Sequence, residues 1–170
     1  MTQVEAIRGP VDTSALGRIL VHEHVFLMNM EYAQNYRPDL FEEETVARAA
    51  AKLNALKAAG IDTIIDLTVL GLGRHIPSLA KVAAQTDVNI IVSTGVYTFD
   101  EVPGPFAYYG PGHLCDAPEP MVDHFVRDIV EGIAGTGMRV VLSRANASNR
   151  WAAMSAACIS PAPQASPPPG

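Results

Sequence analysis

Residues 19–24 read Ile19-Leu20-Val21-His22-Glu23-His24, so three aliphatic side chains lead directly into two histidines separated by one residue. The aliphatic run is typical of a strand, and residues i and i+2 of a strand project from the same face. We therefore expect the imidazoles of His22 and His24 to leave one face together and Glu23 to face the opposite way. Two converging neutral imidazoles form half of a zinc-type site, whereas the alternative interpretation is two unrelated polar residues at a strand end.

Strands and helices alternate along the rest of the chain. Short β-branched runs predict strands, and apolar residues at helical spacing predict helices. After a small β-hairpin within Gln3–Ile19, the expected elements are a helix at Glu43–Ala59, a strand at Thr63–Leu67, a helix at Ile76–Ala84, a strand at Asn89–Thr94, a helix at Met121–Ala134 and a strand at Arg139–Leu142. This order indicates an α/β fold with a parallel sheet covered by helices.

Two architectures fit this order, an open doubly wound sheet and a (β/α) barrel. An eight-stranded barrel of the TIM type needs about 250 residues, so a chain of 170 residues would hold only its N-terminal half. Residues 143–170 depart from the pattern, because five of the 13 prolines lie in the last ten residues. We expect a partial barrel over residues 1–142 and a divergent, disordered Ala/Ser/Pro tail over 143–170.

Composition excludes several classes of function. The formal net charge is −6, with 12 Lys+Arg against 18 Asp+Glu, and no basic stripe is present, which argues against nucleic acid and anionic membranes as partners. The two cysteines, Cys115 and Cys158, cannot form a disulfide framework. Residues 1–5 lack the charge and the apolar run of a signal peptide, so we expect a cytoplasmic location.

Other residues carry weaker signals. Gly71 and Gly73 follow a predicted strand as in a dinucleotide fingerprint, but Ile76 stands where the third glycine should be, so we interpret both glycines as turn residues. Neither cysteine has a nearby base that would activate it. The remaining histidines, His75, His113 and His124, are interpreted as surface or capping residues.

Five stretches together carry a resemblance to a known family. They are Leu16–Val25, which contains both histidines, then Gly60–Thr68, Gly71–Arg74, Asn89–Tyr97 and Phe125–Ile129. In this order, between about Gly9 and Arg139, they resemble the phosphotriesterase family of the amidohydrolase superfamily, and in particular its lactonase-type branch.

The resemblance implies a (β/α)₈ barrel that carries two divalent metal ions, zinc by expectation, bridged by a hydroxide. His22 and His24 match ligands of the more buried metal, and Tyr97 matches an aromatic residue that faces the substrate. The implied activity is hydrolysis of an ester bond in a small molecule, either a lactone or an organophosphate triester, by attack of that hydroxide. The implied protein is a soluble metal-dependent hydrolase, with a homodimer as one assembly.

The sequence also departs from this family. The family's metal-bridging carboxylated lysine would fall on Arg144, which cannot form a carbamate, and no lysine follows Lys81. The family's remaining ligands belong to strands that we do not find in this sequence. We therefore expect a truncated, inactive chain, and we hypothesise a reading-frame shift near Arg139. The alternative hypothesis is a non-catalytic half-barrel that self-associates or binds a partner through open sheet edges.

Overall fold

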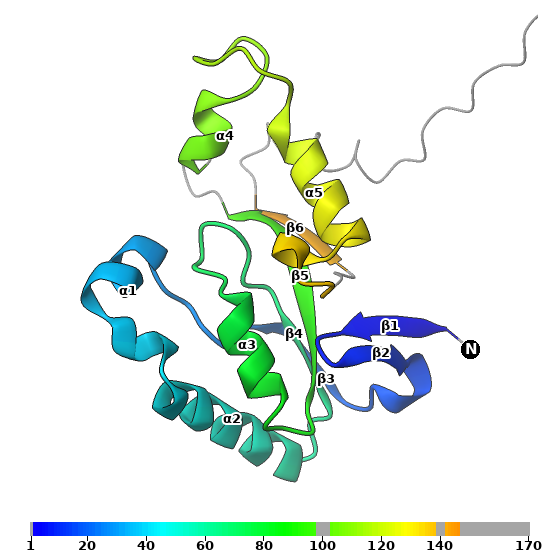
Figure 1. Ribbon diagram of the computed structural model, residues 1–170. Coiled ribbons are helices and arrows are strands. Elements are labelled where there is room, and N and C mark those ends of the chain that lie inside the picture. The colour runs from blue at the N-terminus through cyan, green and yellow to red at the C-terminus, as the bar shows by residue number, and fades with distance from the viewer. Residues whose placement is uncertain (1, 98–102, 139–141, 147–170) are drawn as a thin grey trace, which may run out of the picture.

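A computed structural model describes residues 2–97, 103–138 and 142–146 of the chain (Figure 1). The chain begins with the expected hairpin, in which β1 (Gln3–Ala6) pairs antiparallel with β2 (Gly9–Asp12). The backbone N–H of Ile7, in the turn of this hairpin, donates to the carbonyl of Ile90 at 2.9 Å. The hairpin is thereby attached to the main sheet.

The main sheet contains β3 (Ile19–Glu23), β4 (Thr63–Asp66), β5 (Asn89–Tyr97) and β6 (Leu142–Asn146). All its neighbours pair in parallel, and their spatial order β3-β4-β5-β6 is the order of the sequence. Since parallel crossovers are right-handed, an unreversed order puts the connecting helices on one face of the sheet. A doubly wound sheet would need a reversal of strand order. Of the two architectures, the structure therefore has the partial barrel.

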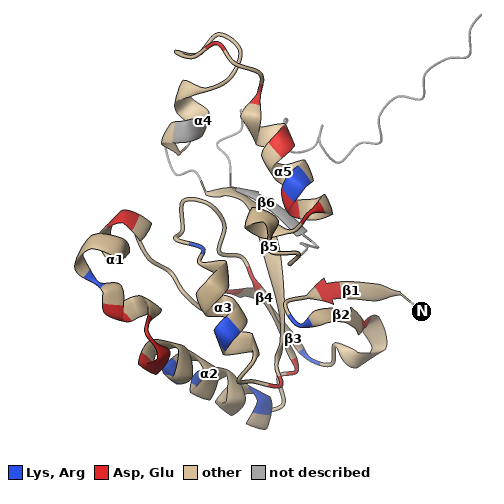
Figure 2. Cartoon of the chain, in the orientation of Figure 1, with Lys and Arg blue, Asp and Glu red and all other residues tan. Residues whose placement is uncertain are grey.

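Three helices make the crossovers near their expected positions. They are α2 (Glu43–Ala58), α3 (Ile76–Ala83) and α5 (Pro120–Val130). Figure 2 shows acidic residues at the start of α2 and basic residues along it, an arrangement that the helix dipole favours. Short helical segments also occur where only loops were expected: α1 (Met30–Tyr36), η2 (Pro38–Phe41) and α4 (Gly104–Tyr108). A further short segment, η1 (Thr13–Ala15), follows the hairpin, and the helix expected to reach Ala134 ends at Val130 and is followed by η3 (Ile133–Gly135).

The main hydrophobic core lies between this helix layer and one face of the sheet. Ile64, Ile90 and Val92 from the strands are packed with helix residues that include Leu53 and Val82. Each such aliphatic side chain contributes about 1.5–3 kcal/mol when it is fully buried. A smaller cluster attaches α4 and α5 to the end of β5, and it consists of Val96, Phe106, Met121 and Phe125.

The fourth strand lies further along the chain than the sequence suggested. It was expected at Arg139–Leu142, but β6 spans Leu142–Asn146 and pairs with Ser93–Tyr97 of β5. Backbone pairing with the exposed edge of β5 therefore outweighs the weak local strand pattern. The disordered tail was expected to begin at residue 143, but residues 143–146 belong to β6 because they pair with β5. Residues 139–141 and the rest of the expected tail, 147–170 with Cys158, lie outside the described residues. Among the helices that the structure does describe, none combines the length and apolarity needed to cross a bilayer.

Candidate metal centre

An irregularity in β3 decides which way its side chains point. Leu20 pairs with Ile64 and Glu23 pairs with Asp66, so three steps along β3 correspond to two along β4. One extra residue is therefore accommodated between Leu20 and Glu23, as in a β-bulge. Because strand side chains alternate, this insertion reverses the facing of every later residue in β3 relative to a regular strand.

The reversal turns the histidines away from the helix layer. Glu23 shares the helix-covered face with its partner Asp66, so His22 and His24 project from the opposite face, which is the inner face of a barrel. Glu23 was expected to face away from both histidines, and the strand pairing agrees. His22 is exposed and His24 is half-buried at the carboxyl end of β3, the end at which barrel enzymes place their active sites.

The two imidazole rings are close enough to share one ion. Their centroids lie 5.5 Å apart with an interplanar angle of 72°. Two histidines bound to one tetrahedral zinc, with Zn–N bonds of about 2.0–2.1 Å, have ring centroids about 5 Å apart. Within residues 2–97, 103–138 and 142–146, no third His, Cys, Asp or Glu joins them. The donor chemistry and the spacing therefore fit a partial zinc site. It supplies two of the three protein ligands that are usual in catalytic zinc centres.

The ring of His24 is held by the end of β4. Its Nδ1 lies 2.9 Å from the hydroxyl oxygen of Thr68, a residue only 4% exposed. Asp66 accepts hydrogen bonds from the backbone N–H of Thr68 at 2.8 Å and of Val25 at 3.2 Å. Burial raises the pKa of Asp66, and hydrogen bonds from Thr68 and Val25 oppose that rise. One buried carboxyl thus joins the ends of two neighbouring strands beside the histidine pair.

Tyr97 ends β5 on the same side of the sheet as the histidines. Its neighbour Val96 packs in the cluster beneath α5, so alternation directs Tyr97 to the inner face. Its backbone N–H donates to the carbonyl of Leu70 at 2.7 Å. Val92 of β5 is level with Asp66 of β4 and Glu23 of β3, and Tyr97 stands five residues beyond Val92. Tyr97 is therefore displaced from the histidines both across the sheet and along it, although all three residues share the inner face.

Comparisons with known proteins identify the family. The profile of the "Phosphotriesterase family" matches residues 2–155. The chain belongs to the phosphotriesterase family. The matched range extends beyond Arg139, where the resemblance in the sequence was expected to end.

Similar proteins agree with this family. A "Phosphotriesterase homology protein" of Mycobacterium tuberculosis is 55% identical over 141 residues, which are 82% of this chain and 43% of that protein. An "Aryldialkylphosphatase" of Saccharolobus solfataricus is 34% identical over 129 residues, 74% of this chain and 38% of that protein. The solved structure of the phosphotriesterase from Mycobacterium tuberculosis superposes with a TM-score of 0.78 at 53% identity, covering 84% of this chain and 44% of that one. The chain thus spans less than half the length of the relatives it matches.

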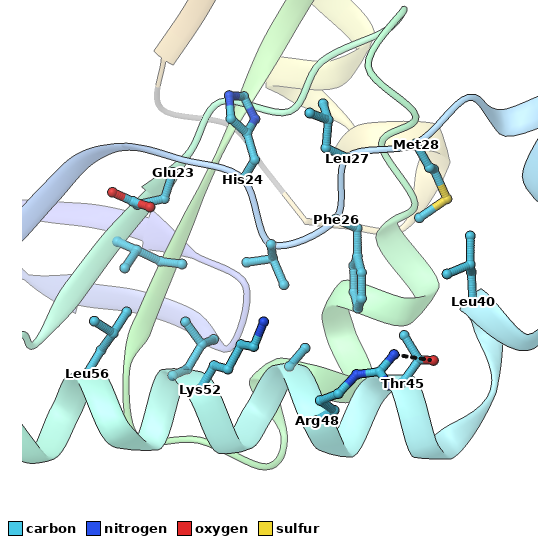
Figure 3. Close-up of a pocket in the computed structure, with 14 residues that line it drawn as sticks. Glu23, His24, Phe26, Leu27, Met28, Leu40, Thr45, Arg48, Lys52 and Leu56 are labelled. Carbon is cyan, nitrogen blue, oxygen red and sulfur yellow. Dashed lines mark hydrogen bonds between the residues drawn. The ribbon is translucent and has the colours of Figure 1, made fainter.

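A groove of about 390 Å³ separates the candidate centre of this phosphotriesterase-family chain from its helix layer. It lies between residues 23–28 and α2. Figure 3 shows the His24 ring directed away from α2, whereas Phe26 points toward α2. Lys52 and Arg48 extend from α2 on the other side of the groove.

The loop after β4 contains the two glycines that resembled a nucleotide fingerprint. Gly73 has φ +80°, and a Cβ there would lie 2.0 Å from the carbonyl oxygen of Met28. The backbone N–H of Met28 also donates to Leu72 at 3.1 Å, so this loop and the segment after His24 are in direct contact. The prediction of turn residues is confirmed for Gly71 and Gly73, both of which have positive φ.

A buried ion pair between β5 and α5, on the side of the strand called here behind β5, was not predicted from the sequence. Arg74 donates to Asp128 of α5 at 3.1 Å and to the carbonyl of Ser93 at 3.0 Å, and both charged side chains are less than 10% exposed. Thr94 donates to the same carboxylate at 2.6 Å. The available signal was Asp128 itself, which stands seven residues after Met121 on the buried stripe of α5.

The remaining three histidines lie away from the candidate metal centre. His75 caps the N-terminus of α3, where its side chain accepts from the backbone N–H of Ser78. His124 lies within α5, with its Nε2 3.7 Å from Asp128. Burial lowers the pKa of both imidazoles. His113 is exposed in the loop before α5, and Cys115 is an exposed free thiol.

Proposed function

We propose that this chain forms the N-terminal part of a metal-dependent hydrolase that cleaves ester bonds in a small molecule, either a lactone or an organophosphate triester. His22 and His24 bind one divalent ion, with zinc as the expected metal, and Tyr97 borders the substrate. Membership of the phosphotriesterase family supports the reaction class. The name of the aryldialkylphosphatase relative supports the organophosphate substrate.

The imidazole pair is the observation that carries the proposal. Its two rings lie 5.5 Å apart on the inner face, at the carboxyl end of β3. The bulge in β3 adds nothing to the packing of the core, because it turns His22 and His24 away from the helix-covered face and toward the inner face of the sheet. A site that selects a metal requires such convergence.

The residues of this chain would then have separate tasks. His22 and His24 hold the ion, and the aromatic ring of Tyr97 offers an apolar and hydrogen-bonding wall to the substrate. A bound divalent ion supplies a Lewis acid for the carbonyl or phosphoryl oxygen and lowers the pKa of water. The two imidazoles alone are fewer than the ligands of a catalytic zinc, so this chain by itself should bind metal weakly and show no turnover.

Zinc binding by the chain tests the ligand assignment. Isothermal titration of the metal-free chain with zinc should give binding that is lost in His22→Ala and in His24→Ala. His113→Ala, in an exposed loop, is the matched control and should bind zinc as the unmodified chain does. Unchanged zinc binding in both of the first two variants would contradict the assignment.

A chimera tests the reaction class. Residues 1–138 of this chain would be joined to the remaining C-terminal part of the 55%-identical Mycobacterium tuberculosis relative. We expect metal-dependent hydrolysis of an aryl phosphotriester or a lactone that is at least about 100-fold weaker in His22→Ala, because loss of a metal ligand costs no less than loss of the groups that support it. Tyr97→Ala should change the ratio of lactone to phosphotriester hydrolysis. A folded, metal-loaded chimera that cleaves neither ester would overturn the proposal.

Self-association is a second candidate, favoured by the exposed edge of the sheet. Among the described strands, β3 has a hydrogen-bonded neighbour, β4, on one side only. On β3, Val21 is 64% exposed, and Val126, Ile129 and Val130 form an exposed apolar stripe on α5. Unpaired parallel edges favour association. Light scattering should then show a dimer of the chain that Val21→Lys converts to a monomer, whereas a monomer at all concentrations would dismiss it.

A further inference from the structure

Three hydrogen bonds connect the histidine segment to the end of β4. In the first, the backbone N–H of Val25 donates to the side chain of Asp66 at 3.2 Å. In the second, the backbone N–H of Leu67 donates to the carbonyl of Glu23 at 3.0 Å. The third joins side chains, Nδ1 of His24 and the hydroxyl of Thr68 at 2.9 Å. Of these three contacts, only the last involves an imidazole.

The direction of that hydrogen bond follows from the atom with which His24 would bind an ion. Nδ1 lies 2.9 Å from the Thr68 hydroxyl, so Nε2 is the ring nitrogen left for a metal. A nitrogen that binds a metal needs a free lone pair, so the proton of a neutral, ligating His24 stands on Nδ1. The hydroxyl oxygen of Thr68 then accepts the hydrogen bond from that N–H.

We propose that Thr68 is a positioning residue, whose hydroxyl fixes His24 in the Nδ1–H tautomer and aims Nε2 at the metal ion. The inference rests on the proposed function, in which His24 is a ligand. A metal-bound histidine usually donates its other N–H to a carboxylate, a carbonyl or another oxygen, and loss of that partner costs 10–100-fold in affinity, on the order seen in other metal sites. Among the described residues, the ring of His22 has no such partner, so Thr68 acts on one ligand of the pair.

A purely structural role for Thr68 is the competing explanation. Its backbone N–H already closes a turn on Asp66 two residues earlier, and that bond survives any substitution except proline. Thr68→Val keeps the shape and the backbone bond and removes only the hydroxyl. Thr68→Ser restores the hydroxyl without the methyl group. The control is Thr86→Val, since Thr86 is equally buried and its hydroxyl accepts only from the backbone of Val88.

The first measurement needs no metal. Two-bond ¹H–¹⁵N spectra of the histidine rings, recorded on the metal-free chain with neutral imidazoles, report which nitrogen carries the proton. His24 should show the Nδ1–H pattern in the unmodified chain, in Thr68→Ser and in Thr86→Val. In Thr68→Val it should move toward the Nε2–H form, which free histidine prefers in water. An unchanged tautomer in a folded Thr68→Val chain would overturn the proposal.

The second measurement is zinc affinity by isothermal titration. Thr68→Val should bind zinc about 10–100-fold more weakly, and Thr68→Ser should recover most of the loss. If His24→Ala abolishes zinc binding while Thr68→Val leaves it intact, the positioning role is wrong and the proposed metal site stands. If His24→Ala leaves zinc binding intact, the proposed site fails, and the role of Thr68 in aiming a ligand fails with it.

Discussion

Strands β3 and β5 both carry candidate site residues, but they are held in place by different forces. β5 is nine residues long, and seven consecutive positions in it are buried between two neighbouring strands and the helix layer. β3 is five residues long and has no fully buried residue. Apolar packing thus fixes the central strand, whereas β3 depends on polar contacts with β4.

This difference shows what fixes the orientation of the side chains at the candidate centre. Tyr97 is aimed by the packing of its neighbour Val96, a contact that tolerates small changes in shape. His24 is aimed by a directional hydrogen bond to Thr68, which depends on one hydroxyl. We therefore expect substitutions behind β5 to change the stability of the fold, and substitutions beside β3 to change the site with little effect on stability.

The largest loss of stability should follow removal of Arg74. Arg74→Met leaves the carboxylate of Asp128 buried without its cation, which typically destabilises a protein by about 3–5 kcal/mol. Urea unfolding followed by circular dichroism would measure the change. Arg37→Met is the matched control, because Arg37 pairs with Asp39 where both side chains are about half exposed, and it should cost about 0–1 kcal/mol.

Two outcomes separate the ion pair from simple packing at Arg74. The double variant Arg74→Met/Asp128→Leu should recover part of the lost stability, since an apolar pair no longer leaves a charge uncompensated. Equal losses of unfolding free energy in Arg74→Met and Arg37→Met would show that the Asp128 carboxylate is effectively solvated. β5 would then not differ from β3 in how strongly its surroundings stabilise the fold.

Truncation of one side chain in each strand tests the same contrast without charges. Ile90 of β5 is 2% exposed within the main core, and Ile90→Ala should destabilise the chain by about 2–5 kcal/mol. Val21 of β3 is 64% exposed, and Val21→Ala should change stability by less than about 0.5 kcal/mol. Both are read from urea midpoints. A loss at Val21 close to that at Ile90 would mean that a surface covering β3 exists in solution.

The sequence predicted the fold well where periodicity is strong. Helix α2 begins and ends within one residue of expectation, because Val46, Ala50 and Leu53 repeat on one face and Gly60 follows its end. The seven-residue α1 was missed. Isolated helices that short are marginal, so α1 depends on its Asn29 cap and on tertiary contacts that no local pattern reveals.

The candidate site was predictable only in part. The spacing of His22 and His24 was sufficient to place both imidazoles on one face. The roles of Asp66 and Thr68 were not predictable, because the contact between Thr68 and His24 joins residues 44 positions apart. The bulge in β3 was equally hidden, since it is defined by the register of pairing with β4 and not by any residue type in the strand.

The pH dependence of stability should give the smallest effect, and it too arises behind β5. Burial lowers the pKa of His124 below its ordinary value; the Asp128 carboxylate opposes this, and Arg74 and Arg127 add to it. The unfolded chain therefore takes up the proton first as the pH falls. The contribution of His124 is complete above about pH 6.5 and is lost as the pH falls toward the lowered folded pKa.

His124→Gln should reduce this loss of stability between about pH 7 and pH 5.5, where one proton changes the slope by at most about 1.4 kcal/mol per pH unit. Unfolding free energies from urea titrations at several pH values give the slope directly. Some slope should remain in the variant, because burial also lowers the pKa of His75 at the start of α3. If His124→Gln follows the same pH curve as the unmodified chain, protonation behind β5 does not weaken the packed side of the fold. The loss of stability in acid would then have to arise elsewhere in the chain. The contrast between β5, held by apolar packing, and β3, held by polar contacts, would rest only on the Arg74/Arg37 and Ile90/Val21 substitutions.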